Sequence, residues 1–316
     1  MLVHRGLPAH PAGVGHVVTI GNFDGVHLGH QAILRELDAA SRRHGAPSCV
    51  VTFEPHPREF FSPRAAPTRL TSLREKCELL QQHHVARAQI VRFNRAFSEL
   101  SADAFIDGVL VRGLGARWVM IGEDFRFGSK RAGDFAHLQK AGRAHGFEVH
   151  AMPTVERSAG DRPAVRVSSS TLRELLAAGD VCGAQALLGR PYSISGRVIH
   201  GDKIGRTLGF PTANIQLRHN RPPLTGIYAV TVEGADAAPR EAVASMGVRP
   251  TVTGSGEMRL EAYIFDFSAD LYGRHLRVNF LRKLRDEAKY AGLEPLKRQI
   301  ALDCEEARAF FHARRA

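Results

Sequence analysis

The sequence predicts two domains of different classes, α/β followed by all-β: a parallel sheet flanked by helices, then a small antiparallel β-barrel with a terminal helix. Three observations predict this. The chain of 316 residues is about twice as long as a typical domain of roughly 100–200 residues. Strand-like runs alternate with helical patterns in the first half, whereas short strand-like runs separated by turns fill most of the second half.

Residues 1–188 form the predicted α/β domain. Runs rich in β-branched and other apolar residues indicate strands at Val14–Ile20, Cys49–Phe53, Gln89–Phe93, Trp118–Ile121 and Phe147–Met152. Helical periodicity between these runs covers Gln31–His44, Ser72–His83, Ala102–Val111 and Asp134–Ala144. Such alternation is typical of βα units, so we expect a Rossmann-like parallel sheet with helices on both faces and a ligand site beyond the carboxyl ends of its strands.

Residues 189–316 form the predicted barrel domain. Two helical patterns, Ser170–Ala178 and Val181–Leu188, precede a Gly-Arg-Pro break at residues 189–191, where we place the boundary. The strand-like runs that follow lie at Ser193–His200, Gly226–Val232, Glu241–Met246, Leu260–Phe267 and His275–Phe280. Strands without intervening helices are typical of a small antiparallel barrel, and the helical pattern at Leu293–Ala313 is expected to pack on it.

Composition narrows the classes of function. Hydrophobic residues make up 44% and charged residues 24% of the chain, values that are ordinary for a folded globular protein. No run approaches the ~20 apolar residues of a membrane helix, and the segment Met1–His16 lacks the apolar stretch of a signal peptide. We therefore expect neither export nor a membrane partner.

Cysteine spacing and charge narrow the classes further. The four cysteines are far apart without a C-x-x-C pair, which fits reduced thiols in a cytoplasmic protein rather than disulfides or a zinc site. The formal charge of +11 would suit nucleic acid, but Lys and Arg are spread along the chain. Nucleic acid is therefore not the expected partner, and the same positive field suits a polyphosphate such as ATP. No sequence feature specifies an oligomeric state.

The segment Gly21–His30, GNFDGVHLGH, connects the first predicted strand to the first predicted helix. Unpaired amides at a helix start favour an anion. Gly25 and Gly29 allow a nucleotide to approach the backbone, while His27 and His30, three residues apart, can face the same phosphate. For the short H-x-G-H string by itself, a glycine-rich turn with two surface histidines is an equal alternative.

The short string resembles the H-x-G-H signature of the nucleotidyltransferase superfamily, and the ten-residue string is similar to that of bacterial bifunctional riboflavin kinase/FAD synthetases. The resemblance covers the chain in order from Gly21 to about Ile300. It implies that His27 and His30 contact the ATP phosphates during adenylyl transfer. It also implies an ATP site that includes Gly21, Asn22, Phe23, Asp24, Gly25 and Gly29.

Two further segments of the first half match this family. They are TFEPHP, after the second predicted strand, and IGEDFRFG, at the end of a later one. The match implies a flavin-binding wall at Phe53, Pro55, His56, Phe125 and Phe127. Each of these residues has an alternative role in a turn or in the core. The position of Asp124 is associated in the family with nucleotide binding or metal-assisted binding, so it joins the predicted ATP site.

The run SSSTLR at residues 168–173 opens another predicted helix. An N-cap would explain one serine, whereas four hydroxyls and an arginine suit a phosphate. The run resembles the family's S-S-T-x-[IL]-R motif, which is a phosphate clamp. The resemblance therefore adds to the ATP site Ser168, Ser169, Ser170, Thr171 and Arg173.

The segment GDKIGRTLGFPTAN at residues 201–214 differs from a Walker loop because it lacks G-K-[ST] and a following helix. Thr212 and Asn214 alternate, so both oxygens can face one side of an extended segment, and hard oxygen ligands suit Mg²⁺. A turn followed by a strand start is the alternative for PTAN alone. The whole string resembles the riboflavin kinase signature, which implies ATP contacts at Gly201, Lys203, Gly205, Gly209, Phe210 and Pro211.

The resemblance also marks Glu261, in a predicted strand, as the general base toward the ribityl 5′-hydroxyl, and Arg285 as a flavin contact. Without it, an exposed strand glutamate and a solvated charge run are the alternatives. The chain departs from the family at Ser245 and Val252, where many relatives have Asn and Phe. These departures leave the contacts of that loop open.

Together the motifs predict two reactions in sequence. Riboflavin and MgATP would give FMN and ADP in the barrel, and FMN and MgATP would give FAD and pyrophosphate in the α/β domain. Flavins are thus substrate and product, with Mg²⁺ as the metal. Two alternatives remain: one activity retained beside a flavin-binding module, or a nucleic-acid-binding protein on an H-x-G-H fold.

Overall fold

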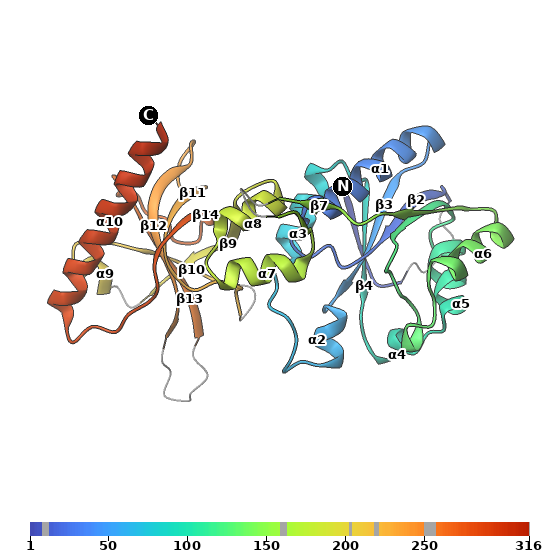
Figure 1. Ribbon diagram of the computed structural model, residues 1–316, viewed down its shortest axis with the longest axis horizontal. Coiled ribbons are helices and arrows are strands. Elements are labelled where there is room, and N and C mark those ends of the chain that lie inside the picture. Colours follow the sequence, from blue (N-terminus) through green and yellow to red (C-terminus); the bar gives the residue numbers. More distant parts are fainter. Residues whose placement is uncertain (8–12, 159–162, 202–203, 218–220, 250–256, 316) are drawn as a thin grey trace. The chain divides into compact units, whose positions relative to one another are not determined.

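The computed structural model describes residues 1–7, 13–158, 163–201, 204–217, 221–249 and 257–315 (Figure 1). By contacts, the chain divides into two compact units. The first contains Met1–Pro67 and Leu73–Glu156, and the second contains Thr68–Ser72 and Arg157–Ala316. The predicted helices at Ser170–Ala178 and Val181–Leu188 precede the boundary expected at residues 189–191. By contacts, both nevertheless belong to the unit that contains the barrel.

The first unit is built on a six-stranded sheet whose paired strands are all parallel. The strand order is β1-β4-β3-β2-β5-β6. The strands span Leu2–Arg5 (β1), His16–Ile20 (β2), Ser48–Glu54 (β3), Arg87–Arg92 (β4), Ala116–Gly122 (β5) and Glu148–Met152 (β6). The predicted parallel sheet is confirmed. The pattern does not predict the edge strand β1, because its four residues are all exposed and show no apolar alternation.

Alternate residues of the buried strands enter two cores, one on each face of the sheet, because successive side chains of a strand point to opposite faces. Val18 and Val119 belong to one core, with residues from α5 (Ala102–Phe105), the π-helix η1 (Ile106–Val111) and α6 (Phe135–His145). Val17 and Trp118 belong to the other, with residues from α1 (Leu28–His44) and α3 (Leu73–Gln82). The predicted helix at 102–111 is therefore an α-helical turn that continues as a π-helix.

Short elements complete the connections. In the first unit these are α2 (Pro57–Phe61), α4 (Arg95–Ser98) and the 3₁₀ helix η2 (Ser129–Arg131). A two-stranded ribbon of β7 (Glu156–Arg157) and β8 (Val165–Arg166) then precedes α7 (Ser169–Ala177) and α8 (Val181–Leu188). Both helices lie within two residues of their predicted bounds.

The second unit contains a closed antiparallel barrel in the order β10-β13-β12-β11-β14-β9, which confirms the predicted fold class. Its strands are β9 (Tyr192–Ile199), β10 (Ala213–Ile215), β11 (Gly226–Glu233), β12 (Arg240–Arg249), β13 (Glu257–Ile264) and β14 (His275–Arg285), with α9 (Ile204–Thr207) before β10. The strand β14 continues five residues beyond its predicted end at Phe280. Arg285 is therefore the last residue of a strand.

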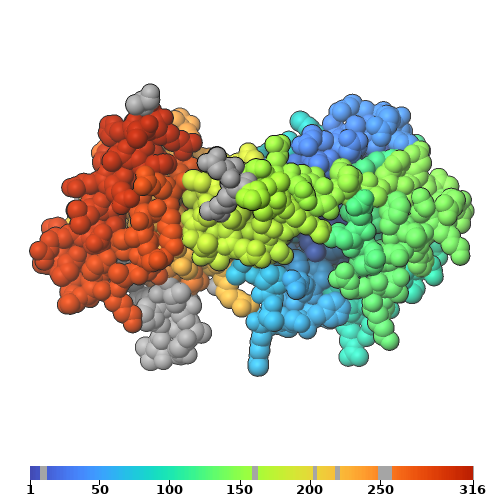
Figure 2. Space-filling model, viewed as in Figure 1, coloured from blue at the N-terminus to red at the C-terminus, as the bar shows by residue number. Residues whose placement is uncertain are grey.

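The terminal helix α10 (Leu293–Arg315) packs on the outside of the barrel (Figure 1). Its buried residues Cys304, Ala307 and Phe311 form one cluster with Ile227 and Ala229 of β11. The side chains of this helix, in red, form an outer surface of the unit (Figure 2). Among the described residues, no helix has the length and apolar character that crossing a lipid bilayer requires.

The packing of α1 on the sheet gives a first prediction. Leu37 is fully buried in the same core as Trp118, the single tryptophan of the chain. Leu37→Ala removes buried apolar contacts and leaves a cavity, so we expect the first unit to lose about 2–5 kcal/mol of stability. Denaturant unfolding followed by Trp118 fluorescence measures this. The matched control is Leu302→Ala on the exposed face of α10, which should leave the Trp118 unfolding transition unchanged. Equal denaturation midpoints for wild type and Leu37→Ala would contradict the described packing.

Candidate functional sites

The two histidines of the Gly21–His30 loop are in contact at the N-terminus of α1. His27 is the N-cap residue, and its Nδ1 accepts a hydrogen bond from the backbone N–H of His30 at 3.3 Å. The two rings stack with centroids 3.7 Å apart and an interplanar angle of 17°. The structure thus brings this pair together beyond the carboxyl end of β2, where the first amides of α1 favour an anion.

Two buried polar atoms of this loop have no hydrogen-bond partner among the described residues, Nδ1 of His30 and Oδ1 of Asn22. Such an atom costs roughly 1–3 kcal/mol, so a ligand that pairs with either would relieve that cost. Burial, followed by the charges of His27 and Lys76, lowers the pKa of His30 well below 6.5. At neutral pH His30 is therefore an uncharged imidazole with one N–H donor and one acceptor nitrogen.

A buried lysine, Lys76 of α3, supports this loop and was missed by the sequence motifs. Only 5% of Lys76 is exposed. Its Nζ donates to Oγ1 of Thr52 at 3.4 Å, and that hydroxyl donates to the backbone carbonyl of Asn22 at 3.1 Å. In the sequence, Lys76 resembles an ordinary solvent-exposed lysine, because its helical segment is rich in charged residues. One feature of the sequence indicates its burial: it lies three residues after Leu73 and four before Leu80, which places it on the inner, apolar face of the helix.

Two other side chains of the Gly21–His30 loop, those of Phe23 and Asp24, are buried. Phe23 is 1% and Asp24 4% exposed, and the Phe23 ring lies 4.8 Å from the His30 ring. Because this ring belongs to the core, a nucleotide could reach Phe23 only through its backbone. Phe23 and Gly25 have φ of 48° and 84°, so the chain turns through the left-handed region here. Gly21 follows β2, and Gly29 lies in the first turn of α1.

An aromatic cluster lies at the carboxyl ends of β3 and β4. Phe93 has ring contacts at 5.5–5.9 Å with Phe53, Phe60, Phe61 and Phe97. Phe53 is 9% exposed, whereas Phe61 is 64% exposed, so the cluster extends from the core to the surface. Sequence motifs found only Phe53, because the other rings come from separate segments.

The other residues of this unit that were predicted to contact flavin or nucleotide differ in their burial and in their local contacts. Phe127 is 7% exposed and packs against Phe105 at 5.6 Å, as a core residue does. Phe125 is half-buried and stacks on Phe127 at 5.9 Å, while Asp124 is exposed. His56 follows Pro55 and caps α2, because its Nδ1 accepts from the N–H of Arg58 and its own N–H donates to Glu59. The side chain of His56 thus has a local structural role.

The hydroxyl run before α7 is partly explained by capping. Ser168 is the N-cap, and its Oγ accepts from the N–H of Thr171 at 3.2 Å. The Thr171 hydroxyl donates to the carbonyl of Arg166 at 3.1 Å, and Nε of Arg173 donates to the carbonyl of Thr68. A role in phosphate binding for this segment, which includes the half-buried Ser169 and the exposed Ser170, stays a prediction.

In the barrel, one row of cross-strand neighbours joins the predicted kinase residues. Asn214 of β10 pairs with Glu261 of β13, and Glu261 pairs with Ser245 of β12. Ser245 pairs with Ile227 of β11, which pairs with Arg285 of β14. Because directly opposite residues of an antiparallel sheet share a face, these five side chains lie side by side across five strands.

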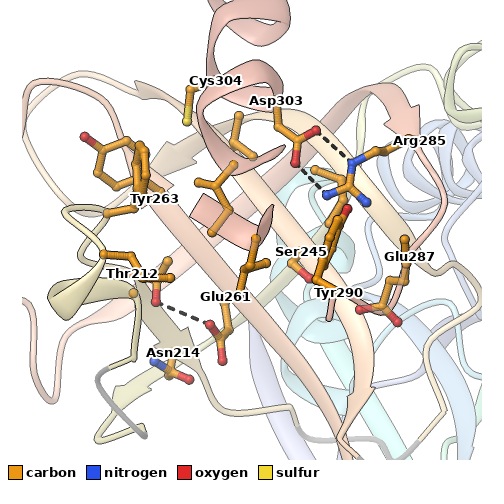
Figure 3. Close-up of a pocket in the computed structure, with 18 residues that line it drawn as sticks. Thr212, Asn214, Ser245, Glu261, Tyr263, Arg285, Glu287, Tyr290, Asp303 and Cys304 are labelled. Carbon is orange, nitrogen blue, oxygen red and sulfur yellow. Dashed lines mark hydrogen bonds and ion pairs between the residues drawn. The ribbon is translucent and has the colours of Figure 1, made fainter. Parts of the chain in front are cut away.

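This row borders a cavity of about 310 Å³ between the barrel wall and α10. Apolar side chains supply much of its lining, including Phe210, Tyr263 and Ile300. Figure 3 shows Thr212, Asn214 and Glu261 together at one end and Arg285 at the other. Oγ1 of Thr212 lies 3.3 Å from Oε2 of Glu261.

A second cavity of about 400 Å³ lies on the other side of Thr212. It is lined by Arg206, Pro211 and Thr212 and by the loop from Phe267 to Tyr272. Thr212 therefore borders both cavities. The sequence motifs did not include the Phe267–Tyr272 loop, because nothing in its composition marks it as more than a turn.

Close contacts explain two glycines of the loop before β10. A Cβ at Gly201 would clash with the amide of Asn214, and one at Gly205 would clash with the carbonyl of Phe210. Glycine at 201 therefore lets the loop pack directly on a predicted metal ligand, while Gly209 is exposed with φ of 89°. Lys203 and Val252 lie outside the described residues.

Both units match known protein families. The family model for FAD synthetase matches residues 10–170, and that for riboflavin kinase matches residues 188–311. A Pseudomonas fluorescens protein named bifunctional riboflavin kinase/FMN adenylyltransferase is 50% identical, with 93% of each chain covered. This chain belongs to that bifunctional family. A protein of the same name from Escherichia coli K12 is 46% identical, with 94% of this chain and 93% of the relative covered.

A solved structure has the same fold as this member of the bifunctional riboflavin kinase/FMN adenylyltransferase family. It is described as a macrolide-efflux protein from Streptococcus pneumoniae and matches with a TM-score of 0.81 and 30% identity. The match covers 98% of this chain and 99% of the other. The family assignment rests on the sequence relatives and on the two family models.

The buried His30 of this family member predicts acid sensitivity of the first unit. Its folded pKa lies well below 6.5, so on acidification the unfolded chain binds a proton that the folded chain does not, and stability falls as pH drops. We expect the first unit to be measurably less stable at about pH 5.5 than at about pH 7.5, with His30 contributing to the loss. Urea unfolding followed by Trp118 fluorescence at both values measures the loss.

The variant His30→Asn should show a smaller acid loss than wild type. His16, whose pKa burial also lowers, accounts for part of what remains. The exposed His312 of α10, in the second unit, is the control, because His312→Asn should leave the Trp118 transition unchanged at both pH values. An equal acid loss in His30→Asn and wild type would show that His30 is not held uncharged.

Proposed function

We infer that this chain phosphorylates riboflavin to FMN in its barrel and then transfers an adenylyl group to FMN in its α/β unit, giving FAD. Membership of the bifunctional family supports both activities. The observation that carries the kinase half is that Asn214 and Glu261 line one cavity beside Thr212, which borders both cavities. Two substrates bound in adjoining cavities would react at that boundary.

In the kinase step, the ribityl 5′-hydroxyl attacks the γ-phosphorus of ATP, and ADP leaves. The hydroxyl proton has to be accepted as the O–P bond forms. Glu261 supplies a carboxylate for this, held in β13 between Asn214 and Ser245. We place riboflavin in the cavity beside α10 and ATP in the cavity bordered by Arg206 and the Phe267–Tyr272 loop.

The oxygen donors at the boundary fit Mg²⁺. Thr212 and Glu261 have oxygens 3.3 Å apart, and the cross-strand neighbour of Glu261 is Asn214. Mg²⁺ is typically held by few protein oxygens together with substrate phosphates. The described residues contain no group of three or more His, Cys, Asp or Glu able to hold a metal, which suits a metal that arrives with ATP. When bound, Mg²⁺ would offset charge on the phosphates.

In the adenylyl transfer step, a phosphate oxygen of FMN attacks the α-phosphorus of ATP, and pyrophosphate leaves. The nucleophile is already ionised, so this site needs positioning and charge stabilisation more than a base. The neutral His30, its stacked neighbour His27 and the N-terminus of α1 supply hydrogen-bond donors for the phosphates. Lys76 adds a buried positive charge acting on the same imidazole.

We further place the protein in the cytoplasm, because its four cysteines are all unpaired thiols.

The two proposed sites predict that each activity can be removed separately. Glu261→Gln removes the proton acceptor, so FMN formation from riboflavin should fall by about a hundred- to ten-thousand-fold. Conversion of supplied FMN to FAD should stay at the wild-type rate. Chromatographic separation of the flavins after incubation with MgATP measures both, and equal loss of the two steps would refute separate sites.

The converse prediction concerns His30. His30→Ala removes a phosphate contact, so conversion of FMN to FAD should fall by about a hundredfold or more, while riboflavin is still phosphorylated. Accumulated FMN in the same chromatographic assay is the expected product. Wild-type FAD formation by this variant would remove His30 from the adenylyl transfer site.

A further inference from the structure

The terminal helix contributes a buried carboxylate to the wall of the flavin cavity. Asp303 of α10 is 4% exposed and lines the cavity. It accepts hydrogen bonds from Nε and Nη2 of Arg285 at 2.8 and 2.7 Å, a bidentate pair (Figure 3). Gln299, one helical turn before it, donates to the same carboxylate at 3.0 Å. The orientation of Arg285 is therefore fixed from α10.

Arg285 keeps donors for a ligand after these contacts. Its Nη1 donates to the carbonyl of Asp286 at 2.9 Å, and its guanidinium carbon lies 5.8 Å from the ring centre of Tyr290. A guanidinium has five N–H groups. Three are used in these bonds with Asp303 and Asp286, which leaves two without a hydrogen bond among the described residues.

The barrel register separates this arginine from the reacting groups. Arg285 and Asn214 are the two ends of the five-strand row, with Glu261, Ser245 and Ile227 between them. If the ribityl hydroxyl reacts beside Glu261, the other end of riboflavin, its planar heterocycle, extends toward Arg285. The heterocycle carries carbonyl oxygens that accept hydrogen bonds, and a planar guanidinium suits such an edge.

We propose that Asp303 is a positioning residue for riboflavin, holding the Arg285 guanidinium at the heterocycle end of the cavity so that α10 is part of the kinase site. This inference rests on the kinase activity proposed above. Its consequence is specific: Asp303 affects how riboflavin binds and leaves the chemistry at Glu261 unchanged. An interaction made equally in the ground state and the transition state alters KM without altering kcat.

A second ion pair provides a matched control. Arg308 of α10 makes a bidentate pair with Asp266 after β13, at 3.0 and 3.1 Å. It ties the same helix to the same barrel. However, the Asp266 side chain is 76% exposed, and neither residue lines the two cavities. Arg308→Gln thus removes an anchor of α10 without touching the flavin wall.

The test is steady-state kinetics of riboflavin phosphorylation by the full chain. For Asp303→Asn we expect KM for riboflavin to rise on the order of tenfold, with kcat and KM for ATP unchanged. Arg285→Lys keeps the positive charge but cannot form the bidentate pair, so it should show the same rise. Arg308→Gln should match wild type, and conversion of FMN to FAD should be unchanged in all three variants.

Thermal unfolding identifies variants that fail to fold, and if Asp303→Asn fails, Arg285→Lys decides alone. An unchanged KM for riboflavin in a folded variant overturns the proposal. So does a loss confined to kcat, or an equal effect of Arg308→Gln. Absence of FMN formation by wild type would instead refute the kinase function itself.

Discussion

Strand register in the barrel is the constraint on which the proposed kinase site depends. In β13, Leu260 and Ala262 are almost fully buried, whereas Glu261 between them lines the cavity. A slip of one residue would turn the carboxylate inward and its apolar neighbours outward. Burying an unpaired carboxylate is costly, so the packing of the barrel interior holds Glu261 in the cavity. The same register aligns Glu261 with Asn214 and Ser245.

The helix α10 joins stability to binding in this unit. Its apolar residues Cys304, Ala307 and Phe311 cover the outer face of β11, which would otherwise be exposed to water. The same helix closes the cavity with Asp303 and Ile300. Burial raises the pKa of the Cys304 thiol to about 11, so this part of the wall is neutral and unreactive at physiological pH. On the α10 side, a flavin in the cavity would therefore meet apolar side chains beside the Arg285–Asp303 ion pair.

Local patterns predict much of this structure because they arise within a single element. Periodicity distinguishes the parallel sheet from the antiparallel barrel, and His27 and His30 meet because both belong to one helical turn. The residues that were missed depend on distant parts of the chain. The side chain of Lys76 reaches Thr52, 24 positions away, and Arg285 pairs with Asp303, 18 positions away. In sequence both Lys76 and Asp303 resemble ordinary charged residues on a solvated helix face.

The two proposed reactions place opposite demands on charge. An alcohol must lose its proton as it attacks phosphorus, so a carboxylate near the hydroxyl is useful and its negative charge is tolerable beside bound metal. A phosphate nucleophile has no proton to lose, and its attack on ATP brings two anions together. There a carboxylate would add repulsion, whereas the neutral imidazole of His30, helix amides and a buried lysine reduce it. The lowered pKa of His30 fits this second site, because an uncharged ring can donate to one phosphate without holding the product by charge. The difference between the two sites therefore follows from the ionisation state of each nucleophile.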